Sequence, residues 1–251
     1  DELKLLAKQP ERFDCNDDHK AILKDLHSFL KQTDNAYFLA FDIEIETSRF
    51  EDNCSDRWLE RATTLKLIIE EVLVTIFSQH TDVLRAYIKF EDDGAYGYRF
   101  HTVTLLSSIA LTEQSWLASF NESLKGLLAD KTRTKNYLEA KYLKELEKIR
   151  NHRDLLEQPF SEETIERIEQ EIKSDIESFQ HISFKLINWN SQLRNFNPEL
   201  KFHIDASFTT EDLRLLEYWG IKYLFISGKY IYFPLHNKKL HPSIKCWVKD
   251  T

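Results

Sequence analysis

The stretch AYFLAFDIEIETSRF, residues 36–50, places three acids on alternate positions of an apolar run. Residues two apart in a β-strand project to the same face, so this alternation predicts a strand over residues 37–46. Asp42, Glu44 and Glu46 would share one face, while the apolar residues between them face the core. Like charges on one face repel each other unless a cation lies between them. The row is therefore either a solvated strand face or the lining of a cation site.

Helical and β patterns alternate around this strand. Apolar residues recur at helical spacing over residues 17–32 and again over about 56–78. Two further strands, 83–90 and 98–106, flank the turn DDGAYG and predict a hairpin. The order β-α-β-β predicts an α+β fold whose core is a split sheet of the ferredoxin or RRM type. In such a sheet the first and third strands are central neighbours.

The second half of the chain is less regular. Beyond Thr112 the pattern predicts mostly helix to about residue 190, broken near Pro159. A strand is predicted over 200–208 and a β-hairpin over 222–235. These segments resume the β pattern after a long helical section.

Three regions follow from this organisation. Residues 1–112 would hold the N-terminal helix and the βαββ half of the core, and 113–195 a large acidic helical insertion. Residues 196–251 would hold the C-terminal strands and hairpin that complete the core, with a basic tail. From residue 213 to the end the chain has seven basic and two acidic residues, although its total charge is -8. This tail is the expected place for a phosphate-bearing partner.

The overall composition limits the classes of function. A net charge of -8 argues against tight, nonspecific coating of nucleic acid, but it permits a local basic groove. No apolar run is long enough to cross a bilayer, and the first ten residues, DELKLLAKQP, lack the layout of a signal peptide. Cys15, Cys54 and Cys246 are far apart and predict neither a disulfide framework nor a four-cysteine zinc site. We expect an intracellular protein of the cytoplasm or nucleus, with no membrane partner.

Two other residues are candidates to join the acids. His101 lies on the predicted strand 98–106, so the split-sheet order would place it beside Asp42 and Glu44. Asp205 interrupts the β-prone segment FHIDASF, and a buried charge in a strand needs a partner or an ion. Asp205 could instead cap a helix that starts near Thr210, although a threonine at 209 or 210 would serve better.

The segments FDIEIE, YRFHTVTLL and FHIDASFTTEDLRLL, in this order, resemble the motifs of the archaeo-eukaryotic primase superfamily, most closely its primase-polymerase branch. The resemblance implies template-dependent nucleotidyl transfer by a DNA primase or polymerase. It implies that Asp42, Glu44 and Asp205 bind two divalent ions, Mg²⁺ or Mn²⁺. A DNA template and primer and nucleoside triphosphates would be the partners.

The resemblance also implies a nucleotide-binding set. His101 would contact the phosphates of the incoming nucleotide, and Arg214 and Lys222 would neutralise its triphosphate, with Arg99 or Lys229 as further candidates. The chain departs from the family at Arg99, where a serine is usual two residues before the histidine. This departure replaces a neutral contact with a cationic one.

Two other functions fit the same sequence. Rolling-circle replication initiators also use a split sheet, and Tyr137 with Lys141 matches their Tyr-x-x-x-Lys motif, which makes Tyr137 an alternative nucleophile for DNA nicking. Against this, Arg99 occupies the place of their first histidine and cannot ligate a metal. The third alternative is a non-enzymatic module that binds a protein partner through the helical section.

Overall fold

The computed structural model describes part of the chain. The described residues are 17–46, 57–92, 98–107, 112–130, 136, 147, 161–164, 166–167, 169–170, 183–222, 231–232, 239–240 and 244–248. The chain divides into two compact units. The first unit comprises Asp1–Glu46, Val74–Asn121 and Phe184–Thr251, and the second comprises Thr47–Leu73 and Glu122–Ser183. The first unit contains nearly all of the main sheet.

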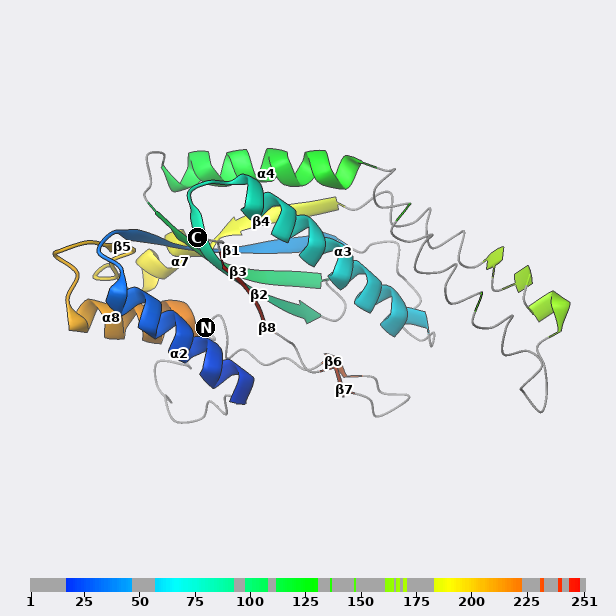
Figure 1. Ribbon diagram of the computed structural model, residues 1–251, viewed down its shortest axis with the longest axis horizontal. Coiled ribbons are helices and arrows are strands. Elements are labelled where there is room, and N and C mark those ends of the chain that lie inside the picture. Colours follow the sequence, from blue (N-terminus) through cyan, green and yellow to red (C-terminus); the bar gives the residue numbers. More distant parts are fainter. Residues whose placement is uncertain are drawn as a thin grey trace. The chain divides into compact units, whose positions relative to one another are not determined.

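The main sheet is built around the acidic strand (Figure 1). Its strands lie in the order β4-β1-β3-β2-β8, and the short β5 pairs with the start of β1. The bounds are β1 Ala36–Glu46, β2 Val83–Asp92, β3 Tyr98–Leu106, β4 Ser183–Asn188, β5 His203–Ile204 and β8 Ile244–Val248. The pairs β1 with β3, β3 with β2, β2 with β8 and β1 with β5 are all antiparallel. The fold is therefore α+β, and the first and third predicted strands are neighbours, as expected.

One face of β1 changes character along its length. Phe38 and Ala40 are fully buried there, in a core to which α2 (Asp17–Gln32), α7 (Trp189–Phe196) and α8 (Thr210–Leu216) contribute. The next positions on that face are Asp42 and Glu44. The apolar core therefore ends at Ala40, and a charged region begins on the same face.

The other face of β1 is apolar from Leu39 to Ile45. Phe41 and Ile43 are fully buried, which confirms the predicted alternation. Phe41 lies edge-on to Phe120 of α4 (Glu113–Ala129), with ring centroids 5.0 Å apart. Phe120 in turn stacks on Phe77, near the end of α3 (Arg57–Gln79), at 6.0 Å. Both faces of the strand are thus covered along its first half.

The helices α2, α3 and α4 match the predicted helical segments. The start of α8 also agrees: Thr209 is its N-cap and forms a reciprocal capping box with Asp212. The helix then continues as a π-helix, η4 (Glu217–Lys222), which the sequence did not indicate. No described helix is long and apolar enough to span a bilayer.

Three predictions about the second half need correction. The predicted helix up to residue 190 is wrong for Ser183–Asn188, which form β4 because the β-prone run SFKLIN pairs at the edge of the sheet. The strand predicted over 200–208 shortens to His203–Ile204, since a turn follows it. Ile244–Val248 adds β8 next to β2, where we expected only a basic tail.

The predicted hairpin over 222–235 is only partly described. Residues 223–230 and 233–238 lie outside the described segments. The described residues between and after these two segments form β6 (Ile231–Tyr232) and β7 (Lys239–Leu240). These two strands pair in a separate two-stranded sheet. Most of the predicted helical insertion between 131 and 182 also lies outside the described residues.

Candidate functional site

The register of β1 and β3 brings opposite charges together. Asp42 lies directly opposite His101, and Glu44 directly opposite Arg99. Directly opposite residues of an antiparallel pair project from the same face. All four side chains therefore belong to the face on which the apolar core ends. The predicted neighbourhood of Asp42, Glu44 and His101 is correct.

Asp42 and His101 form the buried part of this site. The Asp42 side chain has no exposed surface and that of His101 has 6%. Asp42 Oδ1 lies 2.6 Å from His101 Nδ1, within hydrogen-bond distance. Asp42 Oδ2 is buried and has no hydrogen-bond donor within the described segments, and its contact with Arg99 Nε is an ion pair at 3.7 Å. One oxygen of Asp42 thus orients the imidazole, and the other lacks a hydrogen bond.

Arg99 lies between the two carboxylates. Its NH2 group donates to Glu44 Oε1 at 2.6 Å, while its Nε approaches Asp42. The Glu44 side chain is 30% exposed, so the site reaches solvent on the Glu44 side. The repulsion expected between the two acids is offset by this guanidinium. Arg99 therefore has a structural role in this arrangement.

Lys89 extends the polar row onto a third strand. It lies on β2 directly opposite His101, and it is fully buried. The row Asp42, His101 and Lys89 thus crosses β1, β3 and β2 on one face. Lys89 was not predicted from the sequence. The signal for it lay in the predicted hairpin of 83–90 with 98–106, because the register of that hairpin sets which residue faces His101.

The structure does not bring Asp205 to this site. Ile204 pairs with Ala36 at the start of β1, so Asp205 lies beside the opposite end of the strand from Asp42. Six residues of strand at about 3.3 Å each put the two acids roughly 20 Å apart. Asp205 Oδ1 accepts hydrogen bonds from the backbone and hydroxyl of Ser207, and these contacts lower the Asp205 pKa. The predicted three-acid cluster is therefore corrected to a pair.

The other predicted residues are spread over the chain. Arg214 lies on α8 with its side chain 76% exposed, and it pairs with Glu211. Lys222 ends η4, and its side chain is not described. Glu46 ends β1, and its side chain is likewise not described. Tyr137 and Lys229 lie outside the described residues.

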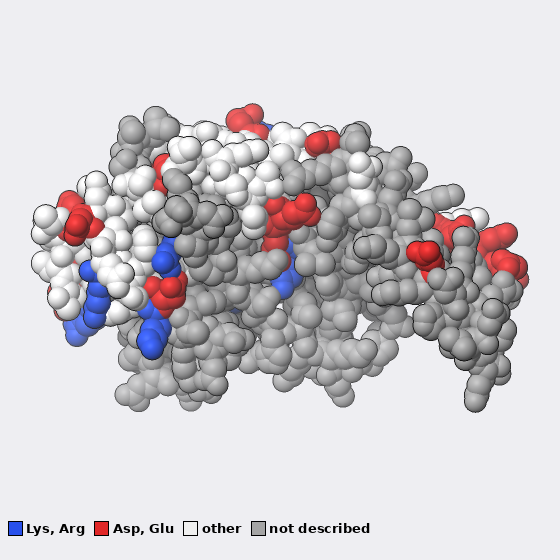
Figure 2. Space-filling view, viewed as in Figure 1, with Lys and Arg blue, Asp and Glu red and all other residues white. Residues whose placement is uncertain are grey.

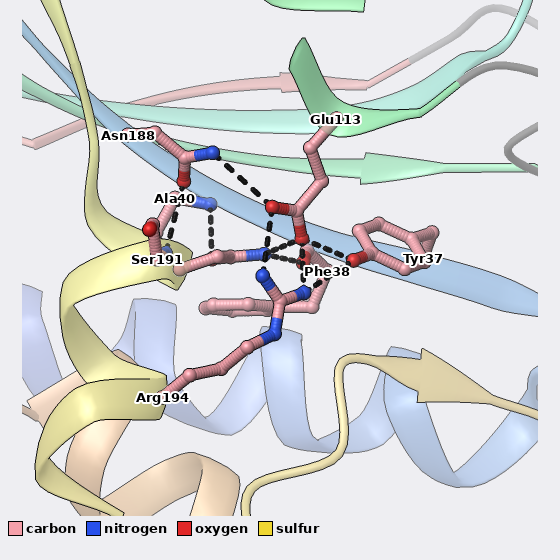
Figure 3. Close-up of polar contacts among 8 residues, drawn as sticks. Tyr37, Phe38, Ala40, Glu113, Asn188, Ser191 and Arg194 are labelled. Atoms are coloured by element: carbon pink, nitrogen blue, oxygen red, sulfur yellow. Dashed lines mark hydrogen bonds and ion pairs between the residues drawn. The ribbon is translucent and has the colours of Figure 1, made fainter. Parts of the chain in front are cut away.

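A second polar cluster, unforeseen from sequence, centres on Glu113 at the start of α4 (Figure 3). Arg194 of α7, Tyr37 of β1 and the amides of Asn188 and Asn190 donate hydrogen bonds to its carboxylate. Burial raises the pKa of Glu113, but these hydrogen bonds outweigh it and lower that pKa to about 2. Burial and the bond to Glu113 raise the pKa of Tyr37.

Asn190 links this Glu113 cluster to the backbone of β1. It is fully buried, accepts from Ala40 N at 3.0 Å and donates to Phe38 O at 2.7 Å. Its amide thus satisfies a donor and an acceptor of β1. The cluster therefore fixes β1 against α4 and α7, two residues before Asp42.

The described residues offer a partial set of metal ligands. They contain no group of three histidine, cysteine or acidic side chains placed to hold one ion. Asp42 and Glu44 supply carboxylate oxygens, which hard divalent cations prefer. Mg²⁺ commonly binds through one or two carboxylates and takes its remaining ligands from water and substrate phosphates. The pair therefore fits one such ion and not the two-ion site expected from three acids.

Comparison of the chain with protein-family models, curated proteins and solved structures finds no match.

Proposed function

We propose that this protein is a divalent-cation-dependent nucleotidyltransferase that extends a DNA strand from nucleoside triphosphates, with Asp42 and Glu44 as the ligands of the catalytic ion. The observation that carries the proposal is the Asp42 carboxylate. It is fully buried, one oxygen contacts His101, and the other has no hydrogen-bond donor among the residues that the structure describes. Burying such a charge is costly unless a cation compensates it, and Arg99 does so only through an ion pair at 3.7 Å, without a hydrogen bond to this oxygen. Mg²⁺ or Mn²⁺ at this oxygen would provide that compensation.

Arg99 occupies part of the space that such an ion would take. In nucleotidyl transfer we expect the ion to displace the guanidinium from the two carboxylates. Arg99 would then be available to a triphosphate, for which its planar group is well suited. His101, oriented by Asp42, would contact the same phosphates. The bound ion would supply positive charge to the attacking 3'-hydroxyl and to the triphosphate.

The strand order supports the finer fold proposal. The elements β1, α3, β2, β3, α4 and β4 follow the β-α-β-β-α-β order of a ferredoxin-like unit. The strands of this unit lie in the order β4-β1-β3-β2, which makes β1 and β3 central. This arrangement supports a ferredoxin-like core carrying the site on its two central strands.

One observation favours a second function. With Asp205 at the far end of β1, the pair Asp42 and Glu44 is suited to one ion, and single-ion chemistry is sufficient for strand nicking of the rolling-circle type. Tyr137 would then attack a phosphodiester and become covalently joined to DNA. Primer extension without a covalent adduct supports the polymerase proposal, and an adduct without extension supports nicking.

The test compares the three acids in one primer-extension assay with Mg²⁺ or Mn²⁺. Asp42→Asn and Glu44→Gln should lose extension by at least about a hundredfold, whereas Asp205→Asn should stay within a fewfold of the parent. Glu44→Gln is the decisive variant, because its partly exposed position makes misfolding a minor concern. Extension that survives both Asp42→Asn and Glu44→Gln would refute the proposal.

The same preparations test the two alternatives. A DNA adduct that withstands denaturation in the parent protein and disappears in Tyr137→Phe would identify nicking. An absence of both extension and adduct, with a folded protein, would leave the charged row as a structural network in a protein-binding module.

A further inference from the structure

A pocket on the α8–η4 helix has the chemistry of a nucleobase site. The described residues that line its volume of about 410 Å³ are Arg214, Leu215, Glu217, Tyr218 and Trp219. This volume lies within the range of pockets that bind small organic groups. The lining combines two aromatic rings, an aliphatic side chain, a guanidinium and a carboxylate. It is separate from the carboxylate pair, whose residues do not line it.

The π-helix that carries part of this pocket packs against the core. Gly220 lies so close to the core that an added Cβ would come within 3.2 Å of the Phe38 ring. Trp219 packs against the same core. The Tyr218 ring lies edge-on to the Trp219 ring, with the two ring centroids 5.5 Å apart. Short π-helical segments occur frequently at functional sites. The aromatic pair is thus held from the core side, and each ring keeps some exposed surface.

Arg214 supplies the positive charge at this pocket. Its only hydrogen-bonding partner in the described residues is Glu211, in a pair whose side chains are 76% and 60% exposed. Such exposed pairs contribute little to stability, so a phosphate could take over the guanidinium at small cost. Glu217, the acidic lining residue, is instead paired with His27 of α2. Figure 2 shows both basic and acidic side chains in the region of α2 and α8.

We propose that this pocket binds an unpaired nucleotide of a single-stranded nucleic acid, with its base stacked on Tyr218 and an adjoining phosphate on Arg214. Base stacking on aromatic side chains and phosphate pairing with arginine are the two main contacts by which proteins hold single strands. Arg214 lies on the exposed side of the helix, so the rest of the strand can continue into solvent. The proposal does not depend on catalysis at Asp42 and Glu44.

The test is fluorescence anisotropy with a labelled ten-nucleotide DNA in EDTA, which removes any metal-dependent step. Tyr218→Ala should weaken binding by about fivefold or more, while Tyr218→Phe keeps the ring and the affinity. Arg214→Ala should weaken binding and reduce the salt dependence by about one phosphate contact. Lys125→Ala is the matched control, because Lys125 also forms an exposed ion pair three residues apart on a helix. It should bind like the parent.

Two further arms decide what occupies the pocket. An oligonucleotide of abasic residues should bind the parent and Tyr218→Ala equally, since it has no base to stack. Equal losses on both oligonucleotides would show that the tyrosine acts in some other way and would overturn the proposal. Any of three other results would also overturn the proposal. Tyr218→Ala and Arg214→Ala could bind the DNA as tightly as the parent, the parent could fail to bind it, or stoichiometric free nucleotide could displace it.

Discussion

Asp42, which is buried, and Glu113, which is partly buried, are two acids on or beside β1 with opposite hydrogen-bonding situations. Glu113 receives hydrogen bonds from four side chains, whereas in the described part of the chain only one oxygen of Asp42 contacts a hydrogen-bond partner. A fully satisfied carboxylate stabilises the structure around it. A partly satisfied one is better placed to bind a cation. This contrast is the residue-level reason for assigning structure to Glu113 and chemistry to Asp42.

The lowered pKa of Glu113 predicts a pH-dependent contribution to stability. Its pKa falls from 4.5 to about 2 on folding, so the contribution is complete above pH 4.5 and is lost as the pH falls towards 2. We expect it to be about 2 kcal/mol, which allows for solvent screening at the partly exposed Arg194. Urea unfolding of the parent and Glu113→Gln at several pH values measures it.

The difference in unfolding free energy between these two proteins should shrink steadily over that pH range. Glu122→Gln removes an exposed carboxylate from the same helix and should follow the parent at every pH. A difference between parent and Glu113→Gln that is independent of pH would contradict the assigned ionisation.

At the scale of elements, β1 is the strand around which the sheet and its helices are arranged. It pairs with β3, lies beside β4, accepts β5 at its start, and has helices packed on both faces. A shift of one residue in its register with β3 would exchange its core and polar faces. The buried Phe38 and Ala40 therefore fix not only the core but also the pairing of Asp42 with His101.

The two described helical glycines predict opposite effects of the same substitution. Gly126 of α4 has nothing within 4 Å of an added Cβ, so Gly126→Ala should raise the free energy of unfolding by up to about 1 kcal/mol. A Cβ added at Gly220 of η4 would lie 3.2 Å from the fully buried Phe38 ring, so Gly220→Ala should lower the free energy of unfolding by about 1 kcal/mol.

Thermal or chemical unfolding of the two alanine variants beside the parent gives the comparison. A stabilising Gly220→Ala would mean that Phe38 can move aside, and that η4 is less firmly fixed against the core than its close approach indicates.

For the whole molecule, binding of a cation should be visible as stability. A ligand that binds only the folded state at ten times its dissociation constant adds about 1.4 kcal/mol. We expect Mn²⁺ to raise the melting temperature of the parent by about 2–4 °C. Glu44→Gln should show a smaller rise or none, and NaCl of matched ionic strength serves as the control for screening.

This stabilisation tests the ion site independently of any activity. An equal rise in the parent and in both Glu44→Gln and Asp42→Asn would assign the ion to other acids of this chain, which carries a net charge of -8.

Local sequence patterns were sufficient for much of the central fold. The alternation in β1, the helices α2, α3 and α4, and the hairpin of β2 and β3 depend on periodicity and turn residues, which short segments contain. The capping box at Thr209 is equally local. The same patterns gave the neighbourhood of Asp42, Glu44 and His101, because the βαββ order makes the first and third strands adjacent.

The sequence by itself thus determined an α+β protein with acids on one face of its central strand and a histidine opposite them. Only the tertiary structure decided that Lys89 joins the row, that Arg99 lies between the acids, and that Asp205 lies at the other end of β1. Periodicity fixes the face on which a side chain lies. The distance between residues far apart in the chain depends instead on strand register and on where a distant segment docks.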